Sequence, residues 1–260
     1  MNKLIFSVPA VLTLAGSSMA APTTPSAAVI VQQMLESDPW GLSGASVAAH
    51  AVLSDKAGAQ SELAFSAKSR RLAPSLAASL VRFSAPPDLA GAGFLQIQKK
   101  EGDDDRMLFL PDLGRARRIS GNLRSNAFMG TDMSFADLDR RDLRDGTATL
   151  TGSETLQRWD CFVVNVVPKS ASSQYSRVEI WVRKDNHLPL KMNMFDRSNV
   201  LLKTFAALEV KRVGESWFIS RSRMTNVQQK HSTELVLDKI VTTTQFGDED
   251  FTVRELEKSK

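Results

Sequence analysis

Alternation of apolar and polar residues dominates the chain after Ser46. It recurs in short segments separated by polar or Gly/Pro turns, which is the period of a half-buried strand. We expect strands over 46–54, 60–68, 76–84, 93–100, 106–110, 115–119, 147–153, 157–168, 176–184, 188–195, 200–210, 215–225 and 231–243. The connections are too short for crossover helices, so the pattern predicts an antiparallel meander.

Two stretches depart from this period. Apolar positions recur at helical spacing from Val29 onward, which predicts one amphipathic helix capped by Ser26 and stopped at Asp38-Pro39. The segment 122–145 shows no alternation, and its part from Ser134 to Leu138 predicts one or two short helical turns. This segment is expected to lie over another part of the protein.

The number of strands limits the fold to a few arrangements, because one antiparallel sheet of this size must curl, split or close. The pattern favours a mainly β protein with a few helices, built as a strongly curved sheet or incomplete barrel with helices against its concave face. A β-sandwich explains the same pattern and stays open as the alternative. Both faces of the strand 157–168 should be covered, since both of its parities are apolar: Trp159, Cys161 and Val163 on one, Phe162, Val164 and Val166 on the other.

The N-terminus has the features of a secretory signal peptide. One lysine precedes an apolar run from Leu4 to Ala15, and small residues at Ser18 and Ala20 fit a cleavage before Ala21. The run is too short for a transmembrane helix, and Ser17 stands where a lipid-modified protein would carry a cysteine. We therefore expect a signal peptide over 1–20, a flexible lead over 21–28 and a single domain over 29–260, in a soluble periplasmic protein.

Charge and motifs exclude several function classes. The net charge of +4 comes from mixed signs, which does not indicate a nucleic-acid partner. No motif of a hydrolase or nucleotide enzyme is present, and the three histidines are isolated, so we expect no enzyme, cofactor or metal site. Cys161, in the middle of a strand, is expected to be a small buried residue. The run from Asp103 to Asp105 is expected to be a solvated hairpin loop.

Strand parity gives candidates for an apolar face that is buried against core or ligand. Three predicted strands each contribute two apolar residues, flanked by polar residues of the opposite parity. The candidates are Leu63, Phe65, Val81, Phe83, Leu95 and Ile97. Further apolar candidates come from the segment without alternation, and they are Phe128, Met129, Met133 and Phe135. Flexible methionines and rigid phenylalanines suit a mobile lid over 122–138, although filling the core is an equal alternative.

Three arginines precede this segment and are candidates for contacts with an anionic head group. They are Arg115, Arg117 and Arg118, and we expect them at the base of the lid. The alternative is a solvated edge strand, or pairing with Asp112, Asp132 and Asp137.

The phrase FLPDLGRARRISGNLRSNAFMGTDMSFADL resembles the signature of outer-membrane lipoprotein-sorting proteins of the LolA-like superfamily. The ending GDEDFTVRELE is similar to how many of those chains finish, and the resemblance covers roughly Ile30 to Lys258. It implies an unclosed antiparallel β-barrel with a helical lid over a hydrophobic cavity that accepts acyl chains. No position here matches the lid-locking arginine of the founding carriers.

The resemblance implies a periplasmic carrier, or chaperone, that binds the acyl chains of lipoproteins or lipids for transport toward the outer membrane. Its partners would be an inner-membrane transporter and an outer-membrane acceptor, and the carrier itself would be a monomer. The alternative function is a periplasmic accessory module that serves an inner-membrane lipid exporter.

The signal peptide gives a direct prediction about the exported protein. Mass spectrometry of the protein isolated from the periplasmic fraction should find an unmodified N-terminus at Ala21. An acylated N-terminus, or retention in the membrane pellet after a high-salt wash, would contradict the prediction.

Overall fold

The computed structural model describes residues 24–38, 44–242 and 245–258. The predicted signal peptide lies outside the described residues, as do residues 21–23 of the expected lead. Residues 24–26 of that lead have no regular structure, and its last two residues, 27 and 28, are already helical rather than part of a flexible lead. No helix in the described part is long and apolar enough to cross a membrane.

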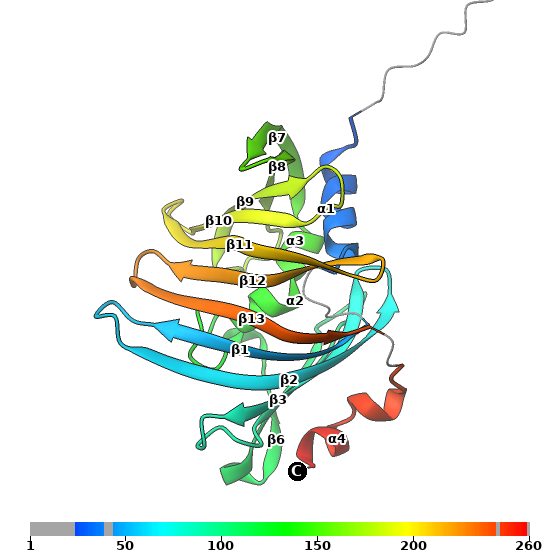
Figure 1. Cartoon of the computed structure of the whole chain (residues 1–260), viewed down its shortest axis with the longest axis vertical. Coiled ribbons are helices and arrows are strands. Elements are labelled where there is room, and N and C mark those ends of the chain that lie inside the picture. Colours follow the sequence, from blue (N-terminus) through cyan, green and yellow to red (C-terminus); the bar gives the residue numbers. More distant parts are fainter. Residues whose placement is uncertain (1–23, 39–43, 243–244, 259–260) are drawn as a thin grey trace, which may run out of the picture.

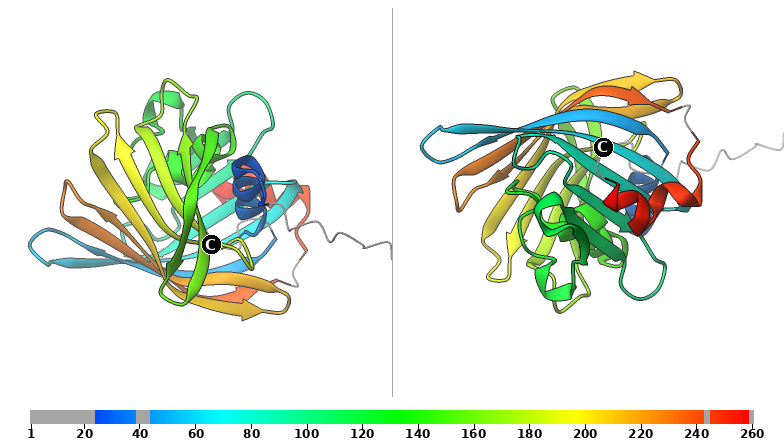
Figure 2. Two further views of the ribbon diagram at one scale, coloured as in Figure 1. Left: turned by 90° about the horizontal axis from the view of Figure 1, so that it is seen from above. Right: turned by 90° about the horizontal axis from the view of Figure 1, so that it is seen from below.

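Thirteen antiparallel strands form one sheet, and each corresponds to a segment predicted from the sequence. The strands are β1 (Ser46–Ser54), β2 (Gln60–Ala73), β3 (Leu76–Ala85), β4 (Gly93–Ile97), β5 (Asp105–Leu110), β6 (Arg115–Arg118), β7 (Thr147–Leu156), β8 (Trp159–Val167), β9 (Tyr175–Arg183), β10 (Pro189–Asp196), β11 (Leu201–Val213), β12 (Ser216–Asn226) and β13 (His231–Val241). The sheet curls strongly without closing, and helices lie inside the curve (Figures 1 and 2). The incomplete barrel is thus confirmed over the β-sandwich.

The strand order places the opening of the sheet between two strands from the middle of the chain. Neighbouring strands follow one another in sequence from β6 back to β1 and from β13 back to β7, and β1 pairs with β13 between them. The two edges are therefore β6 and β7, which are consecutive in the sequence. The chain between them crosses the open side of the sheet.

Helices cover the concave face. Helix α1 (Ala27–Glu36) begins as predicted, with the Ser26 side chain accepting a hydrogen bond from the Val29 N–H. It packs on β7 and β8, and Ile30 and Met34 on its apolar side join the concave core. The crossing segment forms η2 (Gly121–Leu123), α2 (Phe135–Asp139) and α3 (Arg141–Arg144), which agrees with the short helical turns expected there.

Strand β8 is covered on both faces, as its sequence predicts. Val164 and Val166 face α1 in the concave core, whereas Cys161 packs with Trp181 and Leu190 on the outer face. Cys161 is fully buried, and this burial raises the pKa of its thiol.

The chain ends on the outer face of the sheet, where η3 (Asp248–Phe251) and α4 (Val253–Glu257) pack on β3, β4 and β5. Phe251 and Leu256 contact Leu80, Leu95 and Phe109 there. Lys68 of β2 anchors the same end, because its ammonium lies 2.8 Å from Asp250 Oδ1 and 3.2 Å from Glu255 Oε1.

The position of α4 corrects the predicted shared face of the strand candidates. Leu95 pairs with Leu80, and both point outward under α4, whereas Phe94 pairs with Val81 on the concave side. Ile97 shares the outward direction of Leu95. The alternation of apolar and polar residues gave the wrong direction for β4. Its apolar residues are buried on the outer face by α4, and its polar residues therefore point inward.

Packing of α4 can be tested by truncating its buried side chain. Leu256 is fully buried, and Leu256→Ala should lower the free energy of unfolding by about 2–5 kcal/mol, because it leaves a cavity. Val253→Ala, on the 40% exposed residue of the same helix, should change it by less than about 0.5 kcal/mol. Urea denaturation measures both, and equal effects would contradict the packing described here.

Candidate functional site

A cavity of about 180 Å³ lies between the concave face of the sheet and the helices. Strands on both sides of the β1–β13 pair contribute alternate residues to its wall. The strand residues are Val47, Phe65, Ala67, Ala77, Ser79, Val81, Phe94, Gln96, Tyr175, Val178, Pro189, Met192, Met194, Phe205, Ser222, Met224, Thr233, Leu235 and Leu237. Most of these side chains are apolar, so the wall offers dispersion and desolvation rather than polar recognition.

Methionine is a prominent part of the wall. Met34 comes from α1, Met133 from the crossing segment, and Met192, Met194 and Met224 from the strands. A methionine side chain has three rotatable bonds and no branch, so it adapts to irregular ligand shapes. The methionines therefore give this part of the wall an adaptable shape.

The segment 122–138 covers the cavity from the open side of the sheet. Phe128 and Met133 line the cavity, and the Phe128 ring lies 5.1 Å from the ring of Phe94 between centroids. Phe135 packs 5.4 Å from Phe94 in the same aromatic cluster. Both segment phenylalanines are buried, as rings that need an apolar partner should be.

One carboxylate fastens this segment to β9 and β11. Asp137 accepts hydrogen bonds from the Tyr175 hydroxyl at 2.7 Å and from the Lys203 ammonium at 3.0 Å. Asp137 also closes a capping box with Ser134, which fixes the start of α2. Burial, and next the charge of Asp137, raise the pKa of Tyr175 well above its ordinary value.

A second carboxylate fastens the segment to β13. Asp132 Oδ2 lies 2.7 Å from Thr233 Oγ1, which donates to it, and 2.7 Å from His231 Nδ1. The backbone N–H of Asp132 in turn donates to Thr233 Oγ1. The segment is thus held at two points by polar contacts and between them by aromatic packing.

The predicted site residues fall into four groups. Phe65, Val81, Phe128 and Met133 line the cavity, and Leu63, Phe83, Met129 and Phe135 pack in the aromatic cluster beside it. Leu95 and Ile97 face away from the cavity. The arginines at 115, 117 and 118 are exposed on the edge strand β6 and do not line the cavity, and Arg118 pairs with Asp105. Their contact with a head group stays a prediction.

Sequence reasoning missed the polar part of the wall. Gln96, Gln98, Arg140 and Asp142 line the cavity, although the pattern of β4 had placed its glutamines outside. Asp104, expected in a solvated loop, is buried and holds Arg106 at 3.1 Å and Arg141 at 2.7 Å. Arg106 is only two residues from Asp104, but Arg141 is 37 residues away, so the pattern around Asp104 does not reveal its burial.

Among the described residues, no group of three His, Cys, Asp or Glu side chains could hold a metal ion. The charged residues of the cavity wall are instead engaged in hydrogen bonds and ion pairs. The arrangement suits binding of an apolar molecule.

Comparison with solved structures identifies the same architecture in other proteins. A domain from Vibrio parahaemolyticus, assigned as an outer membrane lipoprotein-sorting protein, is 27% identical, with a TM-score of 0.83 over 89% of this chain and 98% of that chain. A DUF1329 family protein from Desulfovibrio piger is 24% identical, with a TM-score of 0.81 over 88% of this chain and 97% of that chain. A LolA superfamily protein from Nitrosomonas europaea is 19% identical, with a TM-score of 0.70 over 88% of this chain and 98% of that chain.

Sequence comparison gives a family without a described activity. No curated protein matches the chain. A family model described only as an uncharacterized protein matches residues 76–258, which include most strands and the crossing segment. The chain therefore belongs to this family, and its fold is that of the LolA-like superfamily.

Proposed function

We propose that the protein is a non-enzymatic periplasmic carrier that shields the acyl chains of lipids or lipoproteins on the way to the outer membrane. The observation that carries the proposal is the apolar cavity under the segment 122–138, which spans the open side of the sheet. The assignment of the Vibrio parahaemolyticus domain to lipoprotein sorting supports the same role.

Energetics favour an apolar chain as the ligand. Each methylene group that leaves water contributes about 0.8 kcal/mol, so a partly enclosed acyl chain gains useful affinity without any polar contact. The cavity is also smaller than the roughly 300–1,000 Å³ of common ligand pockets. We infer that the described state is closed and that cargo enters when the segment moves.

Opening of the segment replaces its own contacts with those of the cargo. Phe128 and Met133 occupy space that an acyl chain would fill, so part of the apolar burial is conserved in the exchange. The polar contacts of Asp132 and Asp137 limit the opening in the free protein. Such a balance permits both uptake from an inner-membrane donor and release to an outer-membrane acceptor.

Truncation of Phe128 tests this competition. Phe128→Ala should weaken the closed state by about 1–3 kcal/mol and so tighten binding of a fluorescent fatty-acid probe by roughly fivefold or more. Leu95→Ala is the matched control, because it removes a similar buried side chain on the outer face and should leave the affinity unchanged.

Hydrogen exchange on the same samples locates the movement. Amides of 122–138 should exchange faster than those of 157–168 in the free protein and slow down on addition of the probe. Equal protection of the two segments without ligand would make 122–138 structural core and would contradict the lid.

Tyr175 offers an internal reporter, because it is the only tyrosine of the chain. In the free protein the tyrosinate absorbance should appear at a pH well above about 10, since burial and Asp137 disfavour the ionised ring. Lipid that displaces α2 from β9 should shift the titration toward the ordinary pKa. Asp137→Asn should lower the pKa of Tyr175 without lipid, and a midpoint near 10 in the free wild-type protein would contradict the closed state.

A further inference from the structure

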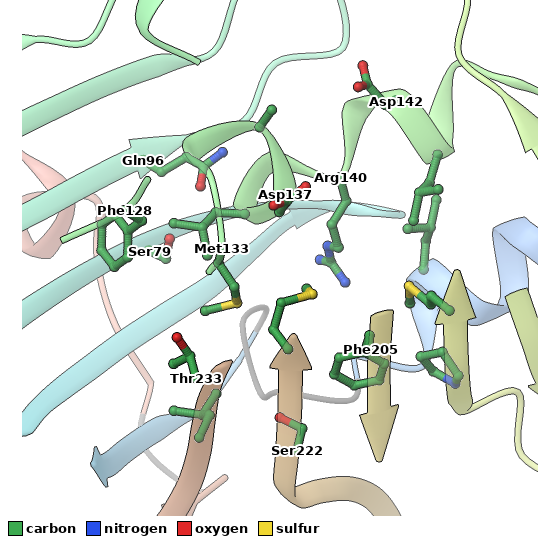
Figure 3. A pocket seen from close by; sticks show the side chains of 18 of the residues that line it. Ser79, Gln96, Phe128, Met133, Asp137, Arg140, Asp142, Phe205, Ser222 and Thr233 are labelled. Atoms are coloured by element: carbon green, nitrogen blue, oxygen red, sulfur yellow. The ribbon is translucent and has the colours of Figure 1, made fainter. Parts of the chain in front are cut away.

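Ser222 of β12 carries a buried hydroxyl group in the wall of the apolar cavity. Its side chain lines the cavity, and the residue is only 5% exposed. Figure 3 shows Ser222 across the cavity from Gln96, on the same side as Phe205. In the sheet it lies between Ala207 of β11 and Leu235 of β13. The register therefore surrounds this hydroxyl with apolar side chains.

The Ser222 hydroxyl has no hydrogen-bond partner among the described residues. Other buried hydroxyls nearby do have one: Ser220 donates to Glu209 Oε2 at 3.3 Å, and Thr233 donates to Asp132 Oδ2 at 2.7 Å. Removing a hydroxyl from water without a partner costs free energy, so most buried hydroxyls in proteins are hydrogen-bonded. An unpaired hydroxyl that faces a ligand cavity indicates a partner that arrives with the ligand.

A second uncharged polar group of side chains lies across the cavity. Ser79 of β3 and Gln96 of β4 are direct neighbours in the two strands, and both line the cavity. The Gln96 amide nitrogen donates to Asp104 Oδ2 at 3.4 Å, which leaves its oxygen as an acceptor. Within the described part of the chain, the Ser79 hydroxyl also has no partner. The polar groups that the protein leaves available in the wall are thus hydroxyls and an amide oxygen.

The charged side chains of the wall already interact with other groups of the protein. Asp137 is paired with Lys203, and Asp142 accepts a hydrogen bond from the Ser173 hydroxyl. Arg140 also has an interaction of its own. An ionised head group inside the cavity would lose its water without meeting a free opposite charge. The wall therefore suits a neutral polar group better than a carboxylate or a phosphate.

We propose that the Ser222 hydroxyl donates a hydrogen bond to the carbonyl oxygen of an acyl ester, so that the ester linkage lies inside the cavity with its chain. Ser79 and Gln96 offer a further donor and acceptor to the uncharged part of the cargo beside that linkage. A few polar groups in an apolar pocket set the orientation and specificity of its ligand. The class of cargo is an esterified acyl chain rather than a free fatty acid or a hydrocarbon. This inference rests on the proposed carrier function and narrows its cargo.

The test compares a pyrene-labelled acyl methyl ester with the methyl ether of the same chain, which lacks the carbonyl oxygen. Fluorescence titration of the mature protein gives both affinities. Ser222→Ala should weaken binding of the ester by roughly fivefold, through the loss of one hydrogen bond, and should leave binding of the ether unchanged or tighter. The ratio of the two affinities cancels any general change in the cavity, as in a double-mutant cycle.

Two further variants complete the comparison. Ser222→Thr keeps the hydroxyl and should retain the wild-type ratio of ester to ether affinity. Ser220→Ala is the matched control, because it makes the same substitution at a buried serine of β12 that is hydrogen-bonded to Glu209, and it should leave the ratio unchanged. A ratio that changes as much in Ser220→Ala as in Ser222→Ala, or in neither, would overturn the ester site and leave the carrier function standing. Binding of neither probe by the wild type would overturn both proposals.

Thermal unfolding of the free protein tests the unpaired hydroxyl separately. Ser222→Ala removes a buried polar group that has no partner among the described residues, so the thermal midpoint of this variant should equal or exceed that of the wild type. A clear fall in the midpoint would mean that the hydroxyl is bound within the protein, and it would overturn the site.

Discussion

The pairing of β1 with β13 is the constraint on which the rest of the structure depends. It joins the first and last strands in the interior of the sheet, in a register that runs from Ser46 opposite Val241 to Ser54 opposite Ser232. The unpaired edges must then fall at β6 and β7, halfway along the chain. Because the chain is continuous, the residues between these strands have to cross the opening. The cover of the cavity is thus a topological consequence of where the chain ends meet.

The crossing segment is stabilised differently from the sheet that it covers. Ladder hydrogen bonds and the apolar core hold the strands, while the segment depends on an aromatic cluster and on the carboxylates of Asp132 and Asp137. Breaking a buried ion pair such as that between Asp137 and Lys203 costs about 3–5 kcal/mol when one partner is removed. A molecule that replaces only the aromatic contacts can leave these charges paired. Polar contacts of the carboxylates therefore hold the segment in place, whereas its aromatic side chains fill the space beside the cavity.

Much of this fold could be predicted from the sequence, because strands with a period of two and a capped helix are local features. All thirteen strands and α1 correspond to predicted segments. The sequence could not show which face of β4 points into the cavity. Leu95 lies on the outer face under α4, which comes from the far end of the chain, and Gln96 lines the cavity instead. The inward direction of Arg140 depends on a left-handed backbone that its neighbours Asp139 and Arg141 do not signal. The burial of Asp104 could not be predicted either, because its partner Arg141 lies 37 residues further along the chain.

The exposed arginines of β6 have a consequence for the open sheet itself. An unpaired edge strand presents hydrogen-bonding groups to any strand of another molecule, and short, charged edges are a common protection against such pairing. β6 has four residues, and Arg115, Arg117 and Arg118 are its exposed ones. Two copies that approached edge to edge would bring six guanidinium groups together. The charges of β6 thus oppose aggregation at one of the two edges that the unclosed sheet creates.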